Sequence, residues 1–324
     1  MKFSSLYFEV THFCNQNCKH CYLDGGTHHK RAELNTEQIK DLLNRFKAQG
    51  GKFVTITGGE PFTRTDIFTI LDYIENLDLS LYLATNCILL NEEKIYKLSQ
   101  YKNLKLVHTS LLGSNEKEHQ YISNHNSFTH ILECLNLFYK YNINVNLQVT
   151  LAKDYICKMV EMADMFSKYQ IKFTPIADIG IKQDRKLQEE IVLSPKNYYL
   201  FLKEYEKVKQ KYGDKIEAHN LITYNELLEE INYYKDKKFY SLTNWCLVLR
   251  PNGDKSFSLD LNNKITFGSA LDSIEIEEDN KLKKYINTLK EIDIDILGVA
   301  KNTTAVNYSY LQDIMLAKKQ NYIE

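Results

Sequence analysis

Three cysteines near the start of the chain, Cys14, Cys18 and Cys21, have the spacing C-x3-C-x2-C. Three thiolates on one short loop can ligate three irons of a four-iron cluster and leave the fourth iron without a protein ligand. Such an open metal position can be occupied by a cofactor or a substrate. A structural zinc site, with His28 or His29 as the fourth ligand, is the alternative that this spacing leaves open.

The chain has seven cysteines in 324 residues. The number is odd, and three of them crowd into eight positions, which favours metal or redox chemistry over a disulfide framework.

A second motif, T-G-G-E-P, occupies residues 57–61 after another strand-like run. Glycines let a backbone approach a ligand closely, and a carboxylate at such a place can hold an ammonium group. A lone Gly-Gly-Glu-Pro is usually only a turn. Here it follows the cysteines by one strand–helix unit, so the two motifs are interpreted together.

In this order the two motifs resemble those of the radical S-adenosylmethionine (SAM) superfamily. The resemblance implies one 4Fe-4S cluster on the three cysteines, with SAM chelating the open iron. It implies that one electron from the cluster cleaves SAM and that the 5′-deoxyadenosyl radical abstracts a substrate hydrogen. It also implies that SAM is bound through its methionyl amino group by Gly58, Gly59, Glu60 and Pro61, and that His20 lies beside the cluster.

Three further segments carry weaker similarities to the family, in the family's order. Asn86 lies in T-N-C, Ser110 lies in S-L-L-G, and Gln148 lies on the fifth strand-like run. The resemblance implies that these three residues contact SAM, while ordinary packing at strand ends is the alternative. Cys87 and Leu112 replace the family's glycine and aspartate. The resemblance covers about residues 5–185.

Six strand-like runs alternate with amphipathic helical runs and would position these motifs at strand ends. The expected strands are Leu6–Thr11, Phe53–Thr57, Ser80–Thr85, Leu104–Ser110, Asn144–Leu151 and Ile171–Ala177. The expected helices follow Asn35 and then cover Asp66–Asn76, Glu92–Gln100, Phe128–Tyr141 and Lys158–Tyr169. Parallel neighbours need a crossover helix, so the pattern predicts an α/β fold, a partial (β/α)6 TIM-like barrel over residues 1–190.

Residues 191–324 are expected to form a small α/β C-terminal extension. Ser194 and Pro195 would open a helix to about Tyr212, a second helical run covers Thr223–Tyr234, and residues 251–254 form a turn between two strands. The segment from Trp245 resembles the SPASM or twitch extension of peptide-modifying radical SAM enzymes. No cysteine follows Cys246, so we expect no auxiliary cluster.

Cys246 is the single catalytic candidate in this extension. Radical SAM peptide epimerases use one cysteine to return a hydrogen atom to an α-carbon radical, and Cys246 could have that role. The alternative is a buried or vestigial cysteine. By the same resemblance the expected substrate is a ribosomally made precursor peptide, with epimerisation favoured over thioether or carbon–carbon crosslinking. A radical SAM enzyme of small-molecule or cofactor biosynthesis and a zinc-stabilised, non-catalytic binding protein are the rival interpretations.

The net charge of −1 gives no electrostatic case for nucleic acid or anionic membranes as partners. No apolar run approaches the roughly 20 residues of a membrane span, and the start lacks the features of a signal peptide, so we expect a cytoplasmic protein. The expected partners are a flavodoxin- or ferredoxin-type electron donor and, because the first strand begins near residue 5, a separate leader-binding protein.

Overall fold

The structure is a computed structural model. It describes residues 3–21, 23, 32–176, 185–193, 195–218, 221–222, 247–256, 269–273 and 306–307. Several residues of the sequence-based expectations lie outside the described residues: His28, His29, Ser194, Cys246 and the helical run over Thr223–Tyr234.

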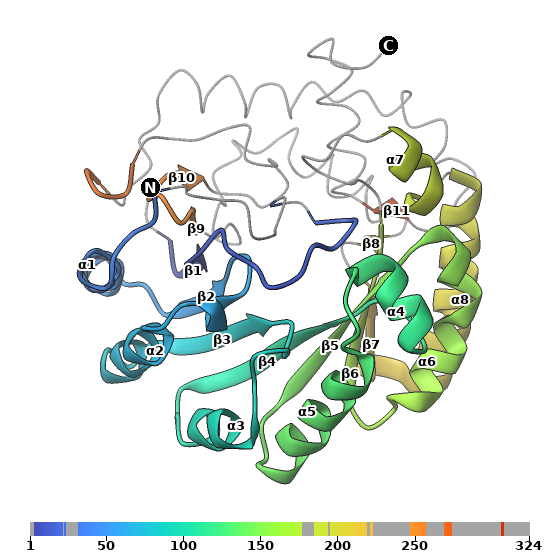
Figure 1. Ribbon diagram of the computed structural model, residues 1–324, viewed down its shortest axis with the longest axis horizontal. Helices are drawn as coiled ribbons and strands as arrows, with labels where there is room; N and C mark the ends of the chain where they lie inside the picture. The colour runs from blue at the N-terminus through green and yellow to red at the C-terminus, as the bar shows by residue number, and fades with distance from the viewer. Residues whose placement is uncertain are drawn as a thin grey trace, which may run out of the picture.

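A curved sheet of nine strands forms the centre of the described fold (Figure 1). Its order is β10-β9-β1-β2-β3-β4-β5-β6-β7, and every neighbouring pair is parallel except β10 with β9. The strands are β1 (Ser5–Glu9), β2 (Phe53–Thr57), β3 (Ser80–Thr85), β4 (Leu104–Leu111), β5 (Val145–Leu151), β6 (Gln170–Pro175), β7 (Ile216–Ala218), β9 (Leu247–Leu249) and β10 (Lys255–Ser256). A separate antiparallel pair joins β8 (Leu221–Ile222) to β11 (Val306–Asn307).

Helices line the outer side of this curved sheet (Figure 1). They are α1 (Thr36–Ala48), α2 (Ile67–Asn76), α3 (Glu92–Ser99), α5 (Phe128–Lys140), α6 (Met159–Met165) and α8 (Pro195–Tyr212). Helices α4 (Glu116–Ser123) and α7 (Arg185–Ile191) pack instead against residues that follow the carboxyl ends of the strands. Short 3₁₀ turns are η1 (Pro61–Thr63), η2 (Lys153–Lys158) and η4 (Gly213–Lys215). The predicted α/β partial barrel is therefore confirmed.

Local sequence explains how the helices start and which side they bury. Asn35 caps α1 by accepting a hydrogen bond from the backbone of Gln38, whose side chain accepts in turn from Asn35. This reciprocal pair is a capping box. The buried face of α1 joins alternate residues of β1, Leu6 and Phe8, in one apolar core. The other residues of each strand face the concave side, where the barrel lumen lies.

The sheet is wider than the six strands that the sequence predicted. Strand β7 adds to β6, and β9, which is more than 230 residues from β1 in the chain, pairs parallel with β1. A buried ion pair between Arg250 and Glu9 accompanies the second addition. Helix α4 was also not predicted. The division at residue 190 stays a prediction, and strands from beyond it join the barrel sheet.

None of the described helices is both long and apolar enough to cross a membrane.

Candidate active site

The cysteine-bearing loop follows the carboxyl end of β1 and covers residues 10–21. Cys14 is buried, whereas Cys18 and Cys21 are partly exposed. The backbone N–H of Cys21 donates to the Cys18 carbonyl oxygen at 3.2 Å, which closes a tight turn between these two cysteines. In the part of the chain that the structure describes, no three His, Cys, Asp or Glu side chains already converge as a metal centre. All three of these thiols come from this one loop.

The Gly-Gly-Glu-Pro segment lies directly against the backbone that leads to Cys14. The N–H of Gly59 donates to the Thr11 carbonyl at 2.8 Å, and that of Glu60 donates to the Phe13 carbonyl at 2.8 Å. A Cβ on Gly58, whose φ is +134°, would stand 2.4 Å from the Thr11 oxygen, and one on Gly59 would stand 2.1 Å from the Phe13 oxygen. Both glycines are therefore needed for this backbone pairing, whether or not they also touch a cofactor.

The Glu60 side chain connects the end of β2 to the end of β3. Its carboxylate is 1 % exposed and accepts hydrogen bonds from the Phe62 N–H, the Thr85 hydroxyl and the Asn86 N–H, at 3.1, 2.9 and 2.7 Å. Burial raises the pKa of Glu60 to about 7, while these hydrogen bonds oppose the rise. A carboxylate offers about four acceptor positions, so three donors leave room for one more.

Asn86 reaches from the end of β3 to the cysteine loop. Its side-chain nitrogen donates to Asn15 Oδ1 at 2.8 Å and lies 3.8 Å from the sulfur of Cys14. Cys87, which replaces the family's glycine, has φ of +66°, the left-handed conformation that glycine adopts most easily. Its buried thiol lies 2.9 Å from the hydroxyl of Thr109, away from the three clustered cysteines.

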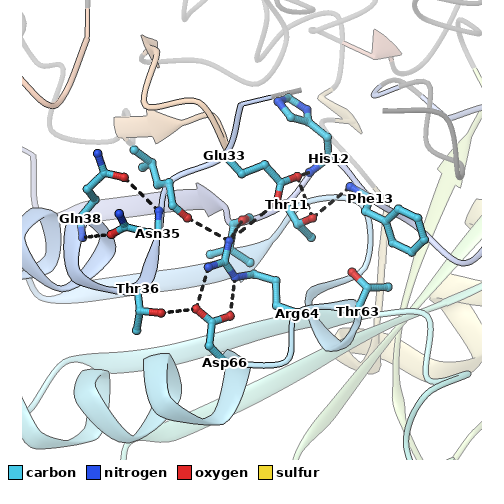
Figure 2. A network of polar contacts seen from close by, with 12 residues as sticks. Thr11, His12, Phe13, Glu33, Asn35, Thr36, Gln38, Thr63, Arg64 and Asp66 are labelled. Carbon is cyan, nitrogen blue, oxygen red and sulfur yellow. Dashed lines mark hydrogen bonds and ion pairs between the residues drawn. The ribbon is translucent and has the colours of Figure 1, made fainter. Parts of the chain in front are cut away.

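A charged network holds the start of the cysteine loop (Figure 2). The Glu33 carboxylate accepts from the Thr11 hydroxyl at 3.0 Å and from the His12 N–H at 2.7 Å. Arg64 donates to the Val10 carbonyl at 3.0 Å and forms a two-pronged contact with Asp66 at 2.9 and 2.7 Å. The geometry ties the loop to the start of α2.

Helix α4 and the turn after it hold the other end of the loop. The N–H of Lys19 donates to the Ile122 carbonyl at 2.8 Å, and the Asn124 side chain donates to the Asn17 carbonyl at 2.8 Å. The ammonium of Lys19 lies 3.4 Å from the centre of the Tyr121 ring. Because α4 was not predicted, this support was missed; Asn115 followed by Glu116 was the helix-start signal that could have found it.

Ser110 and Gln148 lie opposite each other on β4 and β5, facing the lumen. Ser110 is exposed, whereas the Gln148 amide donates to Asn146 Oδ1 at 2.7 Å and lies 3.2 Å from His108 Nδ1. Burial, with a smaller effect of the Lys172 charge, lowers the pKa of His108 to about 4. His108, Asn146 and Gln148 thus form a polar row in the lumen, whereas Ser110 lies at the end of β4.

The structure thus brings most of the sequence-predicted site residues to one end of the sheet. Cys14, Cys18, Cys21 and His20 share the loop, Gly58 to Pro61 pack against it, and Asn86 touches it. Gln148 lies apart, in the lumen row. Sequence reasoning missed Asn15 and Arg64, whose signal was only their position within or just after the two motifs. It noted Thr85 as part of the T-N-C segment and not as a partner of Glu60.

The comparisons with known proteins agree with this geometry. Residues 8–166 match the model of the Radical SAM superfamily. This stretch, just under half of the chain, is a radical SAM domain, as its sequence motifs predicted.

Two curated relatives and one solved structure show the range of similar proteins. The mycofactocin maturase MftC of Mycolicibacterium smegmatis is 28 % identical over 167 residues, 51 % of this chain and 42 % of the relative. An AdoMet-dependent heme synthase of Methanosarcina barkeri is 33 % identical over 112 residues, 35 % of this chain and 32 % of the relative. The match therefore spans less than half the length of these relatives.

Streptococcus suis SuiB, solved bound to S-adenosylmethionine, superposes with a TM-score of 0.71 at 15 % identity over 96 % of this chain and 74 % of that one. At this identity the similarity shows the shared fold.

The residues present fit the cofactors that the family implies. Three thiols come from one loop, and N–H donors already lie near the Cys14 sulfur: the backbone of Gln16 at 3.4 Å and Asn86 at 3.8 Å. Burial raises the pKa of the Cys14 thiol to about 12, so a bound metal ion must provide the charge that displaces its proton.

Proposed function

We propose that this chain is a radical SAM enzyme that ligates one 4Fe-4S cluster through Cys14, Cys18 and Cys21. The observation that carries the proposal is the hydrogen-bonded junction of three segments at one sheet end. The Glu60 N–H donates to the cysteine loop, and the Glu60 carboxylate accepts from the Asn86 N–H. The Asn86 side chain in turn contacts the loop beside Cys14. A structural zinc loop has no need of this three-way junction.

In this proposal the chain's own residues bind and orient SAM and the cluster. The two glycines and Pro61 fix the segment that faces SAM. The buried Glu60 carboxyl has one acceptor position left for a methionyl ammonium group, whose charge would favour the ionised form of Glu60. Asn86 and His20 flank the cluster, and Ser110 lies exposed at the end of β4, where a ribose hydroxyl could bind. When bound, the cluster and SAM supply the radical that removes a substrate hydrogen.

The preferred substrate is a ribosomally made precursor peptide. MftC is a maturase, and SuiB has been solved with its precursor peptide SuiA. Both similarities support a peptide substrate. A ferredoxin- or flavodoxin-type protein is the proposed electron donor. A second candidate, a small-molecule substrate, is favoured by the matching heme synthase.

Among peptide reactions, we favour epimerisation over thioether or carbon–carbon crosslinking. Cys246 as its hydrogen donor is a hypothesis, and a buried or vestigial cysteine is the alternative. Leu247, the first described residue after Cys246, pairs with Leu6 near the start of β1, at the opposite end of that strand from the cysteine loop. The test is Cys246→Ala with a peptide substrate, followed by analysis of the product's stereochemistry. An inverted product from this variant would reject the donor role.

The first experiment is anaerobic reconstitution, followed by counts of iron and sulfide and an assay of SAM cleavage to 5′-deoxyadenosine. We expect about four irons per chain and reductive cleavage. Cys14→Ala, Cys18→Ala and Cys21→Ala should each abolish cleavage, whereas Cys157→Ala, at an exposed cysteine outside the loop, should not. Bound zinc without SAM cleavage would reject the proposal, and more than four irons would point to an auxiliary cluster.

A further inference from the structure

A chain of side-chain hydrogen bonds runs from the end of β4 to Cys18. The N–H of Leu112 donates to His119 Nδ1 at 3.3 Å, and His119 Nε2 lies 3.0 Å from the Ser127 hydroxyl. The Gln16 amide nitrogen lies 3.3 Å from the same hydroxyl, and its amide oxygen lies 3.5 Å from the Cys18 sulfur. Gln16 and Ser127 are 111 positions apart in the sequence.

In the middle of this chain, burial and the tautomer of His119 fix which group donates each hydrogen bond. His119 and Ser127 are 1 % and 2 % exposed, so bulk water does not compete for their polar atoms. Because Nδ1 of His119 accepts from Leu112, its hydrogen lies on Nε2, and the ring donates to Ser127. Burial lowers the pKa of His119 to about 4, which keeps the ring neutral at physiological pH.

The hydroxyl of Ser127 is available for this chain because another residue caps the helix that it precedes. Ser127 stands at the N-cap of α5 but makes no side-chain cap hydrogen bond there. The Glu116 carboxylate accepts instead from the N–H groups of Phe128 and Thr129, each at 3.3 Å. Ser127 therefore receives a hydrogen bond from His119 and can direct its own hydrogen toward Gln16.

The Ser127 hydroxyl decides how the Gln16 amide must lie, because it accepts from His119 and its own hydrogen needs an acceptor. As a thiol, Cys18 donates to the amide oxygen, and the amide nitrogen then points to Ser127. An iron-bound cysteine is a thiolate and can only accept. A half-turn of the amide places its N–H on the sulfur and its oxygen on the Ser127 hydroxyl, so that every donor in the chain has an acceptor.

We propose that the His119–Ser127–Gln16 chain holds the Gln16 amide with its N–H directed at the Cys18 thiolate and thereby raises the reduction potential of the cluster. The inference rests on the proposed cluster ligation. Hydrogen bonds to cluster sulfurs stabilise the more negative, reduced state, and they are one of the means by which proteins set the potential. Gln16, Ser127 and His119 are positioning residues in this proposal.

The test is a redox titration of the reconstituted protein, followed by electron paramagnetic resonance, for the wild type, Gln16→Leu and Ser127→Ala. Both variants should lower the equilibrium constant for reduction by roughly two- to tenfold, which is at most about 59 mV for one electron. Ser123→Ala is the matched control, because Ser123 is equally buried and bonds only around His125. It should leave the potential unchanged.

The sign of the shift distinguishes the two amide orientations. If the amide oxygen faced the thiolate, removing it in Gln16→Leu would raise the potential, and that result would overturn the proposal, as would an unchanged potential in both variants. The resonance signal comes only from molecules that hold a cluster, so a variant with partial occupancy is still informative. A wild-type protein without any cluster signal would instead reject the proposed function.

Discussion

The two ends of the cysteine loop are held by different kinds of interaction. The amino-terminal flank, residues 10–13, pairs with the backbone of Gly59 and Glu60 and is enclosed by the charged groups Arg64 and Glu33 (Figure 2). The carboxy-terminal flank, residues 16–19, is hydrogen-bonded to neutral groups of α4 and of the turn between α4 and α5: it donates to Ile122 and Ser127 and accepts from Asn124.

The charged flank therefore serves to position the loop, whereas the neutral flank serves to adjust the electrostatic environment of the sulfurs. Charged groups can fix a loop through strong contacts, but a charge beside the sulfurs would change the reduction potential of a cluster. Neutral dipoles can be directed at a sulfur without adding net charge. We therefore expect substitutions in the amino-terminal flank to affect stability and cluster loading, and substitutions in the carboxy-terminal flank to affect the properties of the loaded cluster.

The largest effect is expected from Gly59→Ala. A methyl group there would meet the Phe13 carbonyl oxygen at 2.1 Å, and backbone cannot move aside as a flexible side chain can. We expect a loss of more than about 3 kcal/mol of unfolding free energy, or loss of iron binding, measured by urea unfolding and iron content. Gly213→Ala, with φ of +59° but open space around it, should cost only about 1–2 kcal/mol. Equal effects of the two would show that the backbone pairing is unimportant.

A smaller effect is expected from Arg64→Ala. The variant leaves Glu33 and Asp66 without their cation and two carbonyl groups without their donor. The Arg64 side chain is only 11 % exposed, so we expect a loss of roughly 2–4 kcal/mol in urea unfolding. Lys97→Ala, which breaks an exposed ion pair with Asp72, is the control and should cost under about 1 kcal/mol. Similar losses would argue against a special role for the charged network.

The smallest effect is a pH dependence in the carboxy-terminal flank. The pKa of His119 is lowered from 6.5 to about 4 by burial, so between these values the unfolded chain binds a proton that the folded chain does not. Stability must then fall as the pH falls. Between pH 7.5 and pH 5 the wild type should lose up to about 2 kcal/mol more unfolding free energy than His119→Gln does. Urea unfolding at both pH values measures this difference. Equal losses would mean that His119 titrates normally.

Much of the fold could be predicted because its signals are local. The period of apolar residues placed α1, α2, α3 and α5 within a few residues, and Asn35 with Gln38 marked the start of α1. The parts that were missed depend on distant segments. Strand β9 has only three residues, and no local pattern indicates that it pairs with β1.

By itself the sequence determined the chemistry: the number and spacing of the thiols, and the order of the two motifs along the chain. Only the tertiary structure decided which groups surround that chemistry. In the folded chain the glycines of the second motif lie against the cysteine loop, and Ser127 lies beside Gln16, 111 positions away in the sequence. The physical reason is that motif spacing follows from covalent connection, whereas hydrogen-bond partners follow from how the curved sheet brings distant strand ends together.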